Sequence, residues 1–217
     1  MIRKFYVFYV LFIFQIPHAA SIPVDRQLQD IQKKVSMLAN IDKMATQVSQ
    51  SMLPSPYDYL LTQPLMTIGI EKYYQRTPII QTIYAKKNQY DNTYYRAVIM
   101  LLDHNKTRNN VALAQKKKEI MVVELAFITM NFNELPKKVI ADVLNTNIPF
   151  GTLLLKNHIK TLSTSRSYFS VKCNEILSSV THCNLNSQVC DRTSTLTRTD
   201  NNQWIAHVVE ILPGFLR

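Results

Sequence analysis

Glycine is scarce in this sequence, and its scarcity excludes two large classes of nucleotide-binding protein. The chain of 217 residues contains three glycines, Gly69, Gly151 and Gly214. They lie too far apart for the G-x-G-x-x-G dinucleotide fingerprint or for the P-loop of NTPases, because each of these loops needs several glycines within a few residues. The chain therefore has neither of these phosphate-binding loops.

Cysteine is equally scarce, with Cys173, Cys183 and Cys190 all near the C-terminus. Their spacing does not match paired C-x-x-C zinc knuckles, and His182 has no second ligand at helical spacing, so the sequence predicts no metal site. One interpretation is that Cys183 and Cys190 close a short disulfide loop while Cys173 stays buried and reduced. The sequence alone leaves the connectivity open.

Acidic residues are outnumbered, with 15 Asp and Glu against 25 Lys and Arg, which gives a formal net charge of +10. The densest basic run covers residues 116–118. Such a run can bind nucleic acid or an acidic surface, but no RNP, zinc-finger or helix-turn-helix pattern accompanies it. We therefore predict a solvated hairpin turn between strands at this run, and no nucleic-acid partner.

The first twenty residues have the pattern of an export signal. Arg3 and Lys4 precede an apolar run over residues 5–16, and the small residues Ala19 and Ala20 follow it. An apolar run of this length is too short to span a bilayer as a helix and suits a signal peptide. We expect residues 1–20 to be removed and the mature protein to be secreted or periplasmic. The alternative is an uncleaved membrane anchor.

Residues 21–53 predict an amphipathic helical extension. Apolar residues recur there at steps of three and four from Val24 to Met52, with polar residues between them, and Pro54 and Pro56 follow. This spacing gives one apolar stripe along a helix that stops before the prolines. The stripe either packs on its own domain or mediates self-association through residues 24–53 as a coiled coil.

Residues 57–217 predict a single α+β domain. Helical periodicity covers residues 60–74, and two more helices begin near Pro136 and near Phe150. β-branched and aromatic residues predict strands at 79–84, 94–102, 119–132, 168–176, 189–199 and 204–212. This order of helices and strands predicts an α+β fold with one antiparallel sheet of about six strands and flanking helices.

Three sequence blocks follow one another over most of this domain. They are Leu65-Met66-Thr67 with Tyr94-Tyr95-Arg96-Ala97-Val98-Ile99; Leu135-Pro136 through Asn145-Thr146-Asn147-Ile148-Pro149-Phe150-Gly151; and Arg192-Thr193-Ser194 through Ala206-His207-Val208-Val209-Glu210-Ile211-Leu212-Pro213. In this order the blocks resemble the chorismate–pyruvate lyase (4-hydroxybenzoate synthetase) family and its chorismate lyase-like relatives. The resemblance implies an enclosed site between the sheet and the helices.

The resemblance also implies a chemistry and the residues that carry it. Enzymes of this family eliminate pyruvate from chorismate to give 4-hydroxybenzoate, without a metal or an organic cofactor. Arg96 matches the strand arginine that holds a substrate carboxylate, and Glu210 matches an acidic residue near the end of the last strand. A guanidinium binds a carboxylate through two hydrogen bonds, which suits a small anionic aromatic or carboxylate ligand. The two therefore form the candidate catalytic pair.

The remaining candidate site residues are expected to contact the ligand. The resemblance implies that a backbone amide at Phe150 and Gly151 meets the ligand, and that Met66 and Thr67 belong to a helix that covers the site. Arg192 is a further candidate, either as a ligand contact or as an ion-pair partner.

Each of the two charged candidates also has a purely structural interpretation. Arg96 can be an exposed strand arginine or the partner of Glu124 or Glu210. Glu210 lies in an apolar run, so it is either a general acid or base with a raised pKa or an ion-pair partner of Arg96 or Arg192. His207, three positions away on the same strand, should point to the opposite face of the sheet from Glu210.

Two features separate the chain from the lyases that it resembles. Glu124 stands near the point where those lyases carry another arginine, and an exported protein would rarely meet chorismate. The sequence therefore supports two alternatives. The chain is either a lyase acting on chorismate or an exported, non-catalytic binder of a small aromatic or carboxylate ligand in the same pocket.

Overall fold

The computed structural model describes residues 33, 38, 45–105 and 107–214. The expected signal peptide, residues 1–20, lies outside the described residues, as does nearly all of the expected helix up to residue 44. In the described part of the chain, no helix has the length and apolar character needed to cross a membrane.

The described residues form an α+β fold built on one antiparallel sheet, as the sequence predicted. The strand order across the sheet is β1-β5-β6-β7-β4-β3-β2. The strands are β1 (Thr46–Val48), β2 (Ile79–Lys87), β3 (Thr93–Asp103), β4 (Ile120–Asn131), β5 (Thr161–Lys172), β6 (Gln188–Arg198) and β7 (Trp204–Leu212). The sheet therefore has seven strands where about six were expected.

The additional strand, β1, corrects the predicted N-terminal helix. Residues 46–48 pair with β5, and a 3-10 turn, η2 (Gln50–Met52), follows. The helical pattern therefore does not continue to residue 53. Thr46 and Val48 are β-branched and complete the edge of the sheet beside β5, so a tertiary contact overrides the local periodicity.

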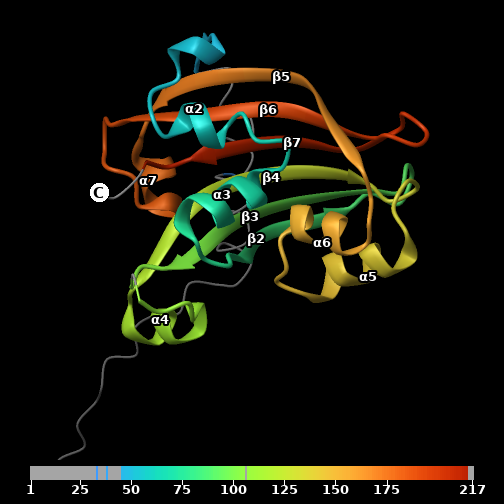
Figure 1. The fold of residues 1–217 in the computed structure, drawn as a ribbon, viewed down its shortest axis with the longest axis horizontal. Coiled ribbons are helices and arrows are strands. Elements are labelled where there is room, and N and C mark those ends of the chain that lie inside the picture. The colour runs from blue at the N-terminus through green and yellow to red at the C-terminus, as the bar shows by residue number, and fades with distance from the viewer. Residues whose placement is uncertain (1–32, 34–37, 39–44, 106, 215–217) are drawn as a thin grey trace, which may run out of the picture.

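Four helices cover one face of the sheet (Figure 1). They are α2 (Tyr57–Leu60), α3 (Met66–Tyr74), α5 (Lys137–Asn145) and α6 (Phe150–Lys156). Pro136 and Pro149 lie directly before α5 and α6, where a residue without an N–H does not disturb the helix. The helices expected at residues 60–74, after Pro136 and at Phe150 are therefore confirmed.

The opposite face of the sheet carries a separate apolar cluster. Alternate residues of the central strands, such as Ala97 and Phe127, face it, and Leu177 of α7 (Glu175–Thr181) packs against them. Leu38 belongs to the same cluster and is 2% exposed. At this position, the predicted N-terminal stripe packs on its own domain. Self-association through residues 24–53 stays a prediction.

The sequence pattern did not predict two short helices. α4 (Val111–Lys117) and α7 each begin after an asparagine whose side chain accepts a hydrogen bond from a backbone N–H of the first turn. Asn110 accepts from Leu113 N and Asn174 from Leu177 N, both at 2.9 Å. This capping stabilises a helix start by satisfying a backbone N–H of the first turn.

α4 also corrects the interpretation of the lysine run. Lys116 and Lys117 lie in the last turn of α4, and Lys118 ends the helix in the left-handed conformation with φ of 57°. The run is therefore a helix end, where cations interact favourably with the unpaired carbonyls, and not a hairpin turn.

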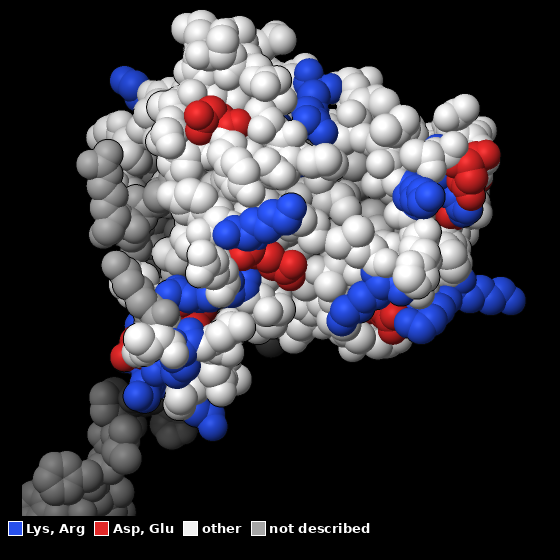
Figure 2. Space-filling view, viewed as in Figure 1, with Lys and Arg blue, Asp and Glu red and all other residues white. Residues whose placement is uncertain are grey.

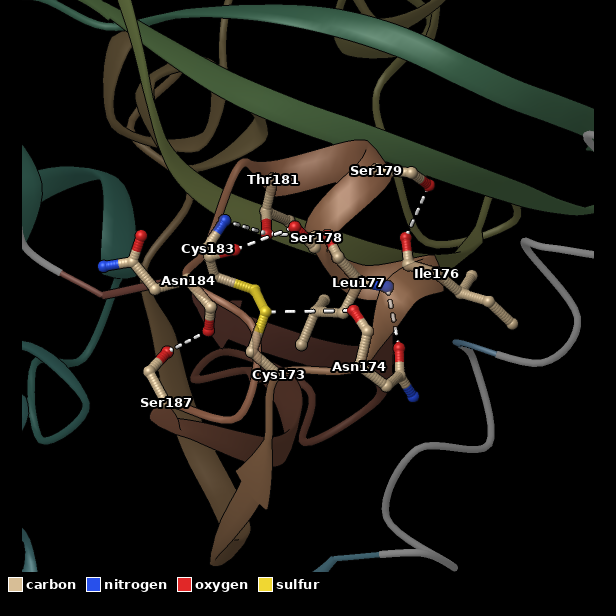
Figure 3. The surroundings of a disulfide bond; sticks show 10 residues. All are labelled: Cys173, Asn174, Ile176, Leu177, Ser178, Ser179, Thr181, Cys183, Asn184 and Ser187. Carbon is tan, nitrogen blue, oxygen red and sulfur yellow. Dashed lines mark hydrogen bonds between the residues drawn. A yellow bond between two sulfur atoms is a disulfide. The ribbon is translucent and has the colours of Figure 1, made fainter.

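The disulfide bond joins Cys173 to Cys183 (Figure 3), so the predicted Cys183–Cys190 pairing is wrong. It connects the loop after β5 to the loop after α7. Cys173 and Cys183 belong to the cluster on the α7 face, whereas Cys190 belongs to the cluster under the helices. The sheet lies between these clusters and separates Cys190 from the other two. Cys190 is free, and burial raises the pKa of its thiol to about 11.

The disulfide should contribute measurably to stability. Replacing both Cys173 and Cys183 with alanine removes a cross-link that spans ten positions, and we expect the free energy of unfolding to fall by about 2–3 kcal/mol. Urea unfolding with and without a reductant measures this effect. The reductant should destabilise the wild type and leave the double variant unchanged; equal midpoints for all four samples would contradict the prediction.

Candidate functional site

A cavity lies between the sheet and the helical layer. The centre of a water molecule can occupy about 40 Å³ of it, which is room for about three waters. The residues at the starts of α3 and α6 form one wall, and side chains of β2, β3, β4, β6 and β7 form the other. The lining residues are Leu65, Met66, Thr67, Ile80, Arg96, Val98, Met100, Glu124, Ala126, Ile128, Met130, Pro149, Phe150, Gly151, Leu196, Val208 and Glu210.

The cavity brings together most of the residues that the sequence predicted for the site. Met66, Thr67, Arg96, Phe150, Gly151 and Glu210 all line it. Arg192 does not line the cavity and lies behind Glu210, so the structure gives it no direct contact with the enclosed space. The predicted roles of these residues toward a ligand stay predictions.

The wall made by α3 and α6 depends on one glycine. A Cβ at Gly151 would lie 3.0 Å from Oγ1 and 3.3 Å from Cβ of Thr67. These separations are shorter than ordinary van der Waals contacts, so a larger residue here would require Thr67 to shift by a few tenths of an ångström. Glycine at position 151 thus permits the close contact between α3 and α6 at the cavity wall.

Arg96 is a buried cation without an acidic partner in the described part of the chain. Its side chain, on β3, is 4% exposed. Nε and Nη2 donate to Oγ1 of Thr82 at 2.9 and 2.7 Å, Nη1 donates to the carbonyl of Val143 at 3.0 Å, and Nη2 reaches the carbonyl of Thr146 at 3.5 Å. Burial lowers the pKa of this guanidinium.

The contacts of Arg96 correct both structural interpretations of that residue. It is not exposed, and it pairs with neither Glu124 nor Glu210. A guanidinium carries five N–H groups, and four of them are used. One Nη1 hydrogen is left without an acceptor among the described residues. Arg96 thus holds the end of α5 against β2 and keeps one donor and its charge for a further partner.

Glu210 and Arg192 form an ion pair across β6 and β7. Arg192 Nε lies 2.5 Å from Glu210 Oε2, and the arginine side chain is 1% exposed. The Nη1 atom of Arg192 donates to the carbonyls of Leu61, at 2.8 Å, and of Gln63. Of the interpretations given for Glu210, the structure shows the ion pair with Arg192. A general acid or base role stays a prediction.

The sequence did not predict the raised pKa of Glu124, a residue of the cavity lining. It lines the cavity, is 2% exposed, and its Oε2 has no hydrogen-bond partner within the described ranges. Burial, with a smaller contribution from Glu210, raises the pKa of its carboxyl well above the usual value, while Arg192 acts in the opposite direction. The raised pKa favours the uncharged form of the Glu124 carboxyl.

The charges around the cavity do not cancel. The Arg192–Glu210 pair is neutral as a unit, Glu124 is uncharged when protonated, and Arg96 has no carboxylate beside it. One positive charge is therefore in excess. The remaining lining is apolar, chiefly Val, Ile, Leu and Met side chains. A cavity with an apolar wall and one uncompensated buried cation is suited to an organic anion.

His207 lies on the other face of the sheet, as predicted. Its Nδ1 is 2.9 Å from Oγ1 of Thr195, and its ring stacks on Trp204. Within the described residues, no group of three His, Cys, Asp or Glu side chains is arranged to hold a metal ion.

Most of the face that carries the helical layer is uncharged in Figure 2. Lys and Arg side chains gather near α4 and beside α5 and α6, where Lys116, Lys117, Lys137, Lys138 and Lys156 lie. On this face, the basic side chains form separate groups with acidic side chains close to them.

Among the comparisons with known proteins, only the one with solved structures gives matches. No protein-family profile matches the chain, and no curated protein matches its sequence. Similar structures include YydK from Bacillus subtilis, with TM-score 0.46 and 11% identity over 89% of this chain and 80% of that one. PhnF from Mycobacterium smegmatis has TM-score 0.46 and 7% identity over 71% and 65%.

A third similar structure is the GntR-family transcriptional regulator from Enterococcus faecalis, with TM-score 0.40 and 11% identity over 64% of this chain and 99% of that one. At these TM-scores, the likenesses carry no argument about the function of this chain.

The raised pKa of the buried Glu124 should make the free energy of unfolding depend on pH. In the unfolded chain, a glutamate has a pKa of about 4.3, whereas the pKa of Glu124 is higher in the folded protein. Above about pH 4.3, the unfolded state therefore binds fewer protons at this site, and the free energy of unfolding falls as the pH rises toward the folded-state pKa.

The substitution Glu124→Gln should remove this fall in the free energy of unfolding at higher pH. Relative to the wild type, we expect the variant to gain stability from pH 5 to pH 8, by up to about 1.4 kcal/mol per pH unit. Urea unfolding at each pH measures the difference, and Glu175→Gln, at an exposed position, is the control. Parallel curves for wild type and Glu124→Gln would show that Glu124 titrates normally.

Proposed function

We propose that this chain binds a small organic acid in the cavity, with Arg96 as the partner of the ligand carboxylate. The observation that carries the proposal is Arg96 itself, a cation that is 4% exposed, lines an apolar cavity and has no carboxylate partner among the described residues. A buried charge is costly unless an opposite charge compensates it, and a bound carboxylate supplies that charge.

The composition of the cavity supports the same ligand class. Apolar side chains suit the hydrocarbon part of an acid, and few polar groups are left to orient it, which is typical of small-molecule sites. The space of about 40 Å³ suits a short-chain acid directly. A larger aromatic acid requires α3 and α6 to move apart.

A second candidate function is the elimination of pyruvate from chorismate, which gives 4-hydroxybenzoate. It is favoured by the presence of Glu210 in the same cavity as Arg96, beside the Phe150–Gly151 turn, as the resemblance to chorismate–pyruvate lyases implies. In this reaction the ether C–O bond of chorismate breaks, the ring loses a proton to become aromatic, and the side chain leaves as pyruvate. Glu210 is the candidate for the proton transfer.

We also propose that the protein is exported, as secreted or periplasmic protein. The pattern of residues 1–20 motivates this, and the Cys173–Cys183 bond supports it, because structural disulfides persist mainly in oxidising compartments. Membrane attachment through an uncleaved residue 1–20 segment is the alternative outcome. N-terminal sequencing of protein recovered from the expressing cells and their medium distinguishes the two.

Binding can be tested by titration calorimetry with pentanoate and benzoate at pH 6. We expect saturable binding to the wild type and a loss of about ten-fold or more in affinity for Arg96→Met, since a hydrogen bond to a charged group contributes about 1.5–3 kcal/mol. Arg76→Met is the matched control, because Arg76 donates to the carbonyl of Asp103, away from the cavity. Absence of binding by folded wild-type protein would refute the proposal.

The lyase candidate is tested separately by measuring pyruvate released from chorismate. We expect release by the wild type and at least a hundred-fold slower release by Glu210→Gln if Glu210 transfers the proton. Release that does not exceed the rate in buffer, with protein that binds benzoate, would reject the lyase and leave acid binding in place.

A further inference from the structure

Glu124 and Arg96 lie at opposite ends of the cavity. On the sheet, Glu124 is opposite Met100, and Arg96 is opposite Ile128. Residues 124 and 128 are four positions apart on β4, so their Cα atoms are about 13 Å apart along the strand. Val98 and Ala126 pair between them and line the same space. The two polar groups therefore mark the ends of the cavity floor, and Glu210 of β7 lies between them, opposite Ala126.

The other charged residues near Glu124 are Arg192 and Glu210, and they form an ion pair with each other. Arg192 binds Glu210 and the carbonyls of Leu61 and Gln63, and it is 1% exposed, so it cannot turn toward a ligand without breaking these contacts. Glu210 accepts from Arg192 through Oε2. No cation is therefore free beside Glu124 among the described residues, and among the cavity-lining residues Glu124 Oε2 is a buried polar atom without a hydrogen-bond partner.

We propose that Glu124 makes the cavity selective for acids with a single negative charge. Its uncharged carboxyl donates a hydrogen bond to a neutral oxygen, a hydroxyl or a carbonyl, at the end of the ligand remote from Arg96. This inference rests on the proposed binding of an organic acid. It adds a contact to the part of the ligand that Arg96 does not bind.

The same arrangement excludes dicarboxylic acids. A second carboxylate of the ligand would approach Glu124 and Glu210, with no cation to compensate it. Either that carboxylate would have to bind a proton or the cavity would hold an unpaired buried charge, and both reduce affinity. A site that hydrogen-bonds a ligand oxygen also rejects the analogue lacking that oxygen, because its own polar group is then left unpaired.

The ionisable groups near Glu124 define the pH dependence of this selectivity. Arg96, Arg192 and Glu210 face the cavity or its floor from β3, β6 and β7. The ionisable residues in the adjoining apolar cluster under the helices are Tyr57 of α2, Tyr74 of α3, Tyr168 of β5 and Cys190 of β6.

Burial raises the pKa of Tyr57 and Tyr74 above the usual phenol value, and that of Cys190 to about 11. These three groups stay uncharged below pH 9. Loss of the proton of Glu124 would add a negative charge beside the ligand, so binding should weaken as the pH rises through the range in which Glu124 ionises.

Two sets of acids with matched shapes test the proposal by calorimetry. The first is pentanoate, 4-oxopentanoate and pentanedioate, and the second is benzoate, 4-hydroxybenzoate and benzene-1,4-dicarboxylate. In at least one set, the wild type should bind the acid with the neutral oxygen at least ten-fold more tightly than its unsubstituted analogue at pH 6. The dicarboxylate should bind at least ten-fold more weakly than that acid.

Two variants assign this selectivity to Glu124. Glu124→Met removes the donor with a similar volume and should abolish the preference for the neutral oxygen while keeping affinity for the unsubstituted acid. Glu124→Gln keeps a neutral donor and should keep the preference without its decline at high pH. Retained unfolding cooperativity shows that both variants are folded.

The failures of the two proposals can be told apart. If acids bind with no preference within either set, or if Glu124→Met keeps the preference, the role of Glu124 is wrong and acid binding stands. If the wild type binds none of the six acids, acid binding itself fails, and this inference fails with it.

Discussion

The helical layer is held to the sheet by arginines that bind three successive backbone carbonyls. Arg192 of β6 donates to the carbonyls of Leu61 and Gln63, and Arg166 of β5 donates to that of Thr62 at 2.8 Å. These carbonyls lie between α2 and α3, where no regular secondary structure would satisfy them. Because Arg192 also binds Glu210, the position of α3 and the geometry of the cavity floor depend on one buried side chain.

The cavity follows from a balance of charges around that arginine. Glu210 neutralises Arg192, whereas Arg96 lines the cavity without a carboxylate partner among the described residues, and Glu210 disfavours a second carboxylate at Glu124. Burial outweighs the opposite effect of Arg192 and raises the pKa of the Glu124 carboxyl.

Much of the fold could be predicted from local sequence, but the parts that depend on burial and on sheet faces could not. Alternating β-branched residues fixed most strands, and Pro136 and Pro149 located two helix starts. The site residues were grouped by resemblance, and the structure brings six of them to one cavity. The disulfide was predicted wrongly, because which face Cys190 occupies depends on strand register. The raised pKa of Glu124 could not be predicted, since it depends on burial and on Glu210 and Arg192 from other strands.

The contact between Gly151 and Thr67 joins the starts of α3 and α6 at the wall of the cavity. Arg192 and Arg166 anchor the segment before α3, and Arg96 anchors the end of α5 through Val143. The boundary between α3 and α6 is closed instead by a close approach at Gly151, without a cross-linking ion pair in the described chain. No ion pair between described residues therefore opposes a separation of these two helix starts above the cavity.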